Sequence, residues 1–160
     1  MKLDARDLAI LRVLAREGRL SKTALADRIG LSPTPAWERL RKLERAGLIE
    51  GYRAQINLRK LGPSVTVFVA AELADHTQAS FRTFEASLQA HEEIVTCWAL
   101  GGRYDYLLQI VTRDIEAYQH LIDTLLDARI GIARYFTYVV TKQVKGGGTP
   151  PLELFLDRMD

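Results

Sequence analysis

The sequence has one cysteine, three histidines and no apolar run of the roughly 20 residues that a membrane span needs. A single Cys97 excludes an intrachain disulfide and a cysteine-based zinc site. His76, His91 and His120 lack the spacing of zinc ligands. The first residues also lack the apolar core of a signal peptide. We therefore expect a cytoplasmic protein with no metal, no cofactor and no membrane contact.

Signs of catalysis are also scarce. Cys97 falls inside a predicted strand, where a small core residue is a better interpretation than a nucleophile. The run 146–148 is all glycine but lacks the Lys-Ser/Thr that follows in a phosphate-binding loop. Asp123 and Asp127, one helical turn apart, are typical of a solvated face. We predict no catalytic residue and no enzymatic activity.

Charge is distributed unevenly along the 160 residues. Residues 1–62 contain 14 Lys and Arg against 7 Asp and Glu, whereas residues 63–160 contain 8 against 13. A basic front and an acidic rear indicate two domains, the first of which has a polyanion as its partner. We place these domains at 1–62 and 63–145, followed by a flexible tail at 146–160 whose apolar residues could either dock or fray.

The front domain has the pattern of a winged helix-turn-helix. Helices are predicted over 4–17, capped by Asp4, and over 22–28, capped by Ser21. A tight turn at Gly30 leads to a third helix, as in helix-turn-helix proteins. Residues 48–57 then alternate like a strand, a glycine turn and a second strand, which would form the wing.

The third helix, within 31–47, has a narrow apolar stripe made by Ala36, Leu40 and Leu43. Its opposite face is basic and carries Trp37, which is typical of a helix that lies against DNA. A solvated amphipathic surface helix is the alternative for this segment alone. Trp37 itself could be packed rather than functional.

The rear domain reads βαββαβ, with strands predicted over 65–73, 94–100, 104–112 and 130–142 and helices starting near Thr77 and after Asp114. This order predicts an α+β, ferredoxin-like domain in which one sheet carries both helices on one face. Residues 65–70 are apolar on both faces of their strand, so the second face should be covered. A second copy of the chain is the simplest cover, and we predict a homodimer.

Three motifs resemble the Lrp/AsnC (feast/famine) family of transcriptional regulators: residues 30–52, residues 102–108 and residues 137–140. The resemblance implies a winged helix-turn-helix that binds double-stranded DNA at palindromic sites. It also implies a βαββαβ domain of the RAM type, which dimerises, assembles further to tetramers or octamers and binds a small effector, usually an amino acid.

The predicted DNA-binding residues lie around the third helix. Hydroxyls at its start suit phosphates, residues of its first turns suit base edges, and basic residues farther along and on the wing suit phosphates. Arg39 is ambiguous, because it could pair with Glu38 or Glu44 or face DNA. The full set is Ser21, Ser32, Thr34, Pro35, Trp37, Glu38, Arg39, Arg41, Lys42, Arg45 and Arg53.

The predicted effector site follows from the chemistry of a free amino acid. Its ammonium group binds a carboxylate, and its carboxylate binds backbone amides or hydroxyls. The residues that would supply them are Gly101, Gly102, Arg103, Tyr104, Asp105, Tyr135 and Thr137. A simple hairpin closure is the alternative for 101–105, and the family resemblance favours the effector site. Tyr135 stands where family members often have Thr or Ser. The larger phenol would reshape the pocket, so we do not predict leucine as the effector.

Two other functions stay open at this point. A small enzyme or metabolite-binding module with a basic tether would need a catalytic constellation, and none is visible. An architectural protein that wraps DNA with little base preference would bind without protecting one defined palindrome.

Overall fold

The computed structural model describes residues 3–146 and 148–155. Its contacts divide the chain into two compact units, residues 1–56 together with 144–160, and residues 57–143. We describe each unit by itself. The domain boundaries predicted at 62/63 and 145/146 stay predictions, because they concern which parts fold independently.

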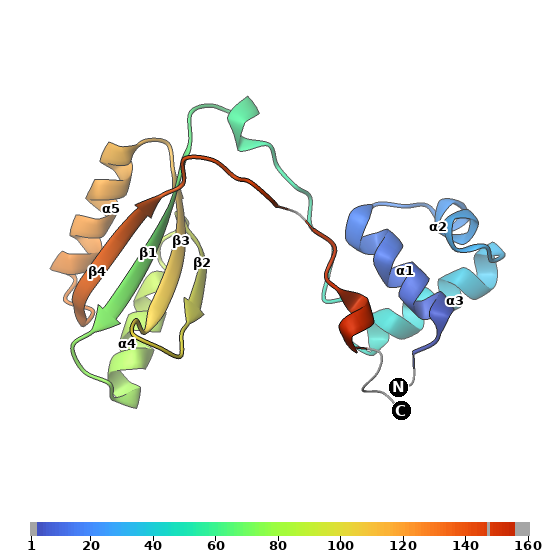
Figure 1. The fold of residues 1–160 in the computed structure, drawn as a ribbon, viewed down its shortest axis with the longest axis horizontal. Helices are drawn as coiled ribbons and strands as arrows, with labels where there is room; N and C mark the ends of the chain where they lie inside the picture. The colour runs from blue at the N-terminus through green and yellow to red at the C-terminus, as the bar shows by residue number, and fades with distance from the viewer. Residues whose placement is uncertain (1–2, 147, 156–160) are drawn as a thin grey trace. The chain divides into compact units, whose positions relative to one another are not determined.

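The first unit contains the three predicted helices (Figure 1): α1 (Ala5–Arg16), α2 (Lys22–Ile29) and α3 (Pro33–Arg45). Each begins and ends for a local reason. The Asp4 side chain accepts hydrogen bonds from the backbone N–H groups of Arg6 and Asp7, and Ser21 caps α2 through the N–H of Ala24. Gly30 ends α2 in the left-handed conformation, with φ of +64°. The capping residues proposed from the sequence for α1 and α2 are therefore confirmed.

The core of this unit is a small apolar cluster to which all three helices contribute. Its buried members are Ile10, Leu25, Ala26, Ile29, Ala36, Leu40 and Leu43. The predicted stripe of α3 is thus confirmed as the buried side of that helix.

The wing differs from the prediction. Residues 48–57 form no strand in the structure, although a hairpin was expected there. Isolated two-stranded hairpins are marginally stable, and Leu48, Tyr52 and Ile56 remain 47%, 47% and 63% exposed. The segment is held instead by side chains, as described below for Tyr52.

The second unit is a four-stranded antiparallel sheet with two helices. Its elements are the 3-10 turn η1 (Leu58–Lys60), β1 (Val65–Leu73), α4 (Gln78–Leu88), β2 (Ile94–Ala99), β3 (Tyr106–Thr112), α5 (Ile115–Asp127) and β4 (Ile132–Val139). The strand order is β2-β3-β1-β4, as Figure 1 shows. Thr77 and Asp114 cap the two helices. The βαββαβ prediction is confirmed.

Alternation along the strands separates the two faces of the sheet. Val67, Val69 and Ala71 of β1 are buried with Leu108 and Ile110 of β3 in the cluster that also contains residues of both helices. Both helices therefore cover the same face, as the connection order predicted.

The opposite face of the sheet is apolar and exposed. Trp98 pairs with Leu107 across β2 and β3, and Phe136 and Tyr138 pair with Ala70 and Phe68 across β4 and β1. The exposed fractions are 44% for Trp98, 38% for Phe136 and 53% for Tyr138. We call this surface the open sheet face.

No helix among the residues that the structure describes is long and apolar enough to cross a membrane. Within those same residues, the structure contains no group of three or more His, Cys, Asp or Glu arranged to hold a metal ion.

Candidate nucleic-acid interface and effector site

Helix α3 presents most of the predicted DNA-binding residues on its surface. Because Ala36, Leu40 and Leu43 point into the core, the positions between them face outward. The exposed predicted residues of α3 and its N-cap are Ser32, Thr34, Pro35, Glu38, Arg41, Lys42 and Arg45. Ser21 is also exposed, but its hydroxyl is occupied in capping α2.

Trp37 lies at the border between this surface and the core. It is half-buried and packs against the apolar cluster of the unit. Two cations lie over its ring, with Lys22 Nζ 4.3 Å and the Arg41 guanidinium carbon 5.1 Å from the ring centroid. Trp37 is therefore packed, and its ring also holds two cations beside the exposed face of α3. Lys22 was missed in the sequence, since it belongs to a different helix.

The start of α3 is poor in backbone donors. Ser32 is the N-cap, and its side chain makes no capping hydrogen bond. Pro33 and Pro35 have no N–H, and the N–H of Ala36 already donates to the Ser32 carbonyl at 3.2 Å. Within the first turn this leaves the N–H of Thr34 and the hydroxyls of Ser32 and Thr34. The predicted phosphate contact thus depends on hydroxyls more than on free amides.

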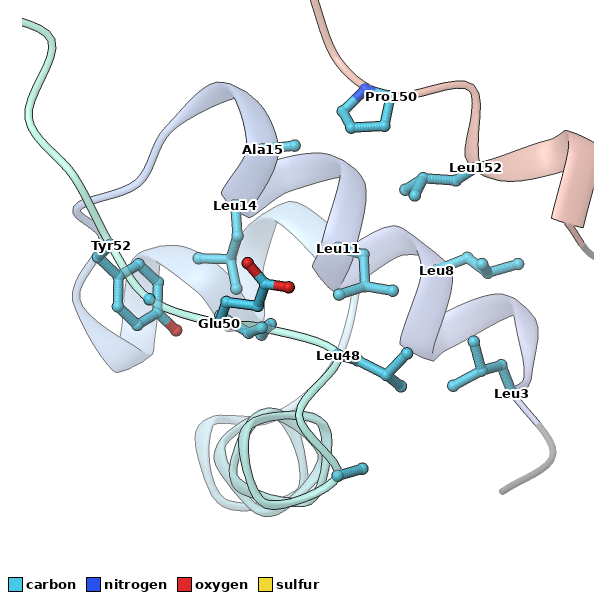
Figure 2. Close-up of a pocket in the computed structure, with 13 residues that line it drawn as sticks. Leu3, Leu8, Leu11, Leu14, Ala15, Leu48, Glu50, Tyr52, Pro150 and Leu152 are labelled. Carbon is cyan, nitrogen blue, oxygen red and sulfur yellow. The ribbon is translucent and has the colours of Figure 1, made fainter. Parts of the chain in front are cut away.

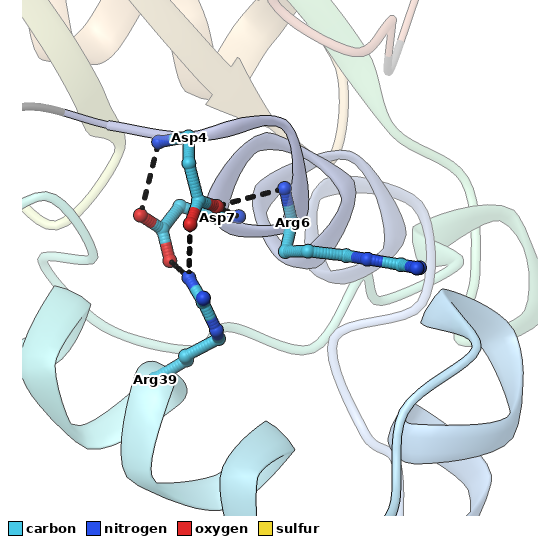
Figure 3. Close-up of polar contacts among 4 residues, drawn as sticks. All are labelled: Asp4, Arg6, Asp7 and Arg39. Carbon is cyan, nitrogen blue, oxygen red and sulfur yellow. Dashed lines mark hydrogen bonds and ion pairs between the residues drawn. The ribbon is translucent and has the colours of Figure 1, made fainter.

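Arg39 pairs with the start of α1 and not with Glu38 or Glu44 (Figure 3). Its Nη1 lies 2.6 Å from Asp4 Oδ2 and 2.8 Å from Asp7 Oδ1, so it ties α3 to the start of α1. Asp7 is 3% exposed, and it also accepts a hydrogen bond from the N–H of Asp4. The proposed pairing with Glu38 or Glu44 is absent among these contacts, and Arg39 is engaged within the protein.

The segment after α3 is tied back to that helix. The Tyr52 hydroxyl donates to Glu44 Oε1 at 2.9 Å. Burial and the bond to Glu44 raise the pKa of Tyr52 to about 12. Arg41 Nη1 lies 3.6 Å from the second oxygen of Glu44. Arg53, the predicted wing contact, follows Tyr52 directly and is exposed.

The predicted effector residues gather at one end of the second unit. The N–H of Leu100 donates to the Asp105 carbonyl, so residues 101–104 form the loop between β2 and β3. Gly101 and Gly102 do not have positive φ, and a Cβ at either would meet nothing within 4 Å. Hairpin closure alone therefore does not require glycine at these two positions, which leave their backbone open to contact.

Asp105 faces inward from this loop. Its Oδ2 accepts a hydrogen bond from the N–H of Leu73 at 2.8 Å, and His76 Nε2 lies 3.0 Å from its Oδ1. His76 is a further residue of the candidate site that the sequence did not indicate, because it stands 29 positions before Asp105.

The aromatic residues of the loop connect it with β4. The rings of Tyr104 and Phe136 are 5.4 Å apart, and the Arg103 guanidinium lies 5.6 Å from the Tyr104 centroid. Tyr135 lies in the same row of the sheet as Tyr106, since both pair with Ala71.

Thr137 is less available than expected. Its hydroxyl is hydrogen-bonded to the hydroxyl of Tyr118 on α5, beneath the sheet. Burial raises the pKa of Tyr118, although the bond to Thr137 acts in the opposite direction. The structure thus brings residues 101–105 and Tyr135 to one end of the sheet, where Tyr135 packs against the core cluster, while the exposed Thr137 is hydrogen-bonded to Tyr118.

Comparison with known protein families matches both units. Residues 3–50 match the winged helix-turn-helix DNA-binding model, and residues 66–150 match the Lrp/AsnC ligand binding domain. The chain belongs to the Lrp/AsnC family of transcriptional regulators. The family resemblance and the fold class expected from the sequence are confirmed, and the chain is a transcriptional regulator rather than an enzyme.

Two individual relatives, both regulatory proteins, match most of this Lrp/AsnC chain. The transcriptional regulatory protein DoeX of Halomonas elongata is 49% identical over 91% of this chain and 92% of its own. The leucine-responsive regulatory protein of Salmonella typhimurium is 42% identical over 89% of this chain and 87% of its own length.

Solved structures have the same fold. A transcriptional regulator of Neisseria meningitidis in complex with L-methionine has a TM-score of 0.90 and 32% identity, covering 97% of this chain and 100% of that one. An AsnC family regulator of Agrobacterium tumefaciens has a TM-score of 0.89 and 32% identity, covering 96% and 100%. A feast or famine regulatory protein of M. tuberculosis, solved with L-methionine, has a TM-score of 0.80 and 28% identity, covering 90% and 95%.

Proposed function

We propose that this regulator binds palindromic double-stranded DNA as a dimer, with α3 in the major groove, and that an amino acid bound near Asp105 controls it. The observation that carries the DNA-binding part is the exposed face of α3, where Arg41 and Lys22 are held over Trp37. Fixed cations reach phosphates and base edges at a smaller entropy cost than free side chains.

Roles within this face follow from position. Residues of the first turns, namely Thr34, Pro35 and Glu38, with Arg41 behind them, would meet base edges. Lys42, Arg45, Arg53 and Lys22 would contact phosphates, as would the hydroxyls of Ser32 and Thr34. Arg39 would act indirectly, by fixing the angle between α1 and α3 through Asp4 and Asp7.

The effector part is supported by the chemistry of the 101–105 loop. The ammonium of an amino acid would replace His76 at Asp105 Oδ1, while the open backbone of Gly101 and Gly102 and the hydroxyl of Tyr135 would meet its carboxylate and side chain. The Neisseria and M. tuberculosis relatives were solved with L-methionine, which makes methionine the first amino acid to test.

The open sheet face supports the dimer. Three large aromatic side chains, Trp98, Phe136 and Tyr138, lie 38–53% exposed on one side of a sheet whose other side packs against both helices. A contiguous apolar surface of this kind marks a protein interface. A self-complementary pairing of two such faces would give a two-fold dimer, and a two-fold dimer reads a palindrome. Further assembly to tetramers or octamers belongs to the same proposal.

A competition experiment tests the DNA-binding part. The wild type should protect one defined palindrome from nuclease at physiological salt in the presence of excess unrelated DNA. Arg41→Ala should weaken binding to that site by about 1–3 kcal/mol and leave binding to scrambled DNA nearly unchanged, if Arg41 contacts a base. Arg28→Ala is the control, because Arg28 pairs with Glu17.

Two outcomes would count against this proposal. Equal losses on palindromic and scrambled DNA would make Arg41 a phosphate contact, and the absence of any protected site would favour an architectural protein.

Lys42→Ala should weaken binding to palindromic and to scrambled DNA equally and should reduce the salt dependence of binding.

A further inference from the structure

An apolar groove lies along α1 in the first unit. It encloses about 880 Å³ and is lined by leucines of α1, by the segment after α3 and by two residues of the C-terminal region. Figure 2 shows Leu8, Leu11 and Leu14 along the helix, with Leu48 on one side and with Pro150 and Leu152 on the other. The groove is on the DNA-binding unit but is not made by the predicted DNA-binding residues of α3.

Charged and polar contacts fix the C-terminal segment beside the same helix. Arg12 forms an ion pair with Glu153, and Arg16 Nε donates to Thr149 Oγ1 at 3.3 Å. Arg12 and Arg16 are one helical turn apart, so both lie on one edge of α1. The pKa of Glu153 is lowered by its own backbone N–H and by Arg12 and Arg16, which all favour the charged carboxylate.

The segment has the composition of a tethered peptide ligand. A glycine-rich stretch at 146–148 precedes Pro150 and Pro151, which stiffen the chain before the short 3-10 turn η2 (Leu152–Phe155). Leu152 of that turn is half-buried at the groove, whereas Leu154 is 70% exposed. Two apolar side chains, one exposed ion pair and one hydrogen bond bind weakly by themselves. A short flexible tether raises the local concentration of such a ligand to about millimolar, which is enough to fill a weak site.

We propose that residues 149–154 dock reversibly against α1, where Pro150 and Leu152 complete one wall of the apolar groove. The surface that receives the segment is identified by the contacts of Arg12 with Glu153 and of Arg16 with Thr149. The docked segment gives the DNA-binding unit a second covalent connection to β4, in addition to residues 57–64.

Thiol labelling of the full-length chain tests this docking. In a Cys97→Ala background, Leu152→Cys should react with a maleimide several-fold more slowly than Leu154→Cys, its matched control in the same turn. Adding Arg12→Glu should accelerate labelling of the cysteine at 152 to the rate of the control. Adding Glu153→Arg to that variant should restore slow labelling, because the charge pair is then re-formed in reverse.

Two results would overturn the proposal. Equal labelling at 152 and 154, unaffected by Arg12→Glu, would mean that the groove does not hold the segment. Labelling at 152 that slows with rising protein concentration would mean that the segment occupies the groove of a second copy. The assay contains neither DNA nor effector, so it can fail while the proposed function stands, and the reverse also holds.

Discussion

At the scale of single residues, the Asp4 carboxylate organises the start of the DNA-binding unit. It caps α1 through the N–H groups of Arg6 and Asp7 and pairs with Arg39 of α3. The N–H of Asp7, followed by Arg39, lowers the pKa of Asp4. One exposed side chain therefore sets both where α1 begins and how α3 is held against it.

We expect Asp4→Ala to reduce the free energy of unfolding by about 1 kcal/mol, as loss of an N-cap does. Because the pKa is lower in the folded state, the contribution of Asp4 is present above its usual value of 3.8 and is lost as pH falls through the lowered pKa. Urea unfolding at pH 7 and pH 3 measures this. The difference in unfolding free energy between the variant and the wild type should be smaller at pH 3 than at pH 7. Asp27→Asn, on the exposed side of α2, should change neither curve.

Asp105 is the residue on which the effector proposal depends most. Asp105→Asn should abolish the increase in melting temperature that methionine or another effector amino acid gives, because the amide cannot balance an ammonium. A calorimetric titration with the amino acids measures the same loss. Asp123→Asn on α5 is the control and should bind like the wild type. Binding by Asp105→Asn with unchanged affinity would move the site elsewhere.

At the scale of elements, the helices and the strands of the sheet could be predicted because their signals are local. Asp4, Ser21, Thr77 and Asp114 each accept from an N–H two or three residues ahead, and alternation along β1 follows from the pleat. The strand prediction for the wing was wrong, since the alternating pattern of residues 48–57 indicates a hairpin, and an isolated two-stranded hairpin is only marginally stable. Tyr52 is held by Glu44 instead.

In the candidate site, too, the features with local signals could be predicted and those that depend on distant partners could not. The exposed side of α3 follows from its period, but the partners of Arg39 lie 32 and 35 positions away, and Lys22 reaches Trp37 from another helix. His76 was missed for the same reason. Long-range pairs of side chains depend on packing, which a single sequence does not reveal.

The hydrogen bond between Tyr118 of α5 and Thr137 of β4 leads to a prediction about how these two elements stabilise each other. Tyr118→Phe and Thr137→Val should each lower the free energy of unfolding by about 0.5–1.5 kcal/mol, because each removes one partner of a part-buried hydrogen bond. The double variant should cost less than the sum of the two. Chemical denaturation of the four proteins gives the coupling energy, and a coupling of zero would contradict the bond.

At the scale of the whole molecule, the proposed dimer depends on the open sheet face. Trp98→Arg should convert the proposed dimer to single chains, since it places a charge on the exposed apolar surface of the edge strand β2. Sedimentation velocity measures the change in mass, and circular dichroism should show the fold intact. Leu154→Arg, exposed in the first unit, is the control. If Trp98→Arg sediments like the wild type, another surface forms the dimer.

The first unit is built from two stretches that lie far apart in the sequence, since residues 8–14 share a groove with Pro150 and Leu152. On the ribosome, the three helices can pack once residues 5–45 have emerged, whereas the groove waits until residues 150–152 have been translated. A nascent chain would therefore display its leucines throughout synthesis of the sheet. Translation of residues 150–152 is the event that completes the wall beside them.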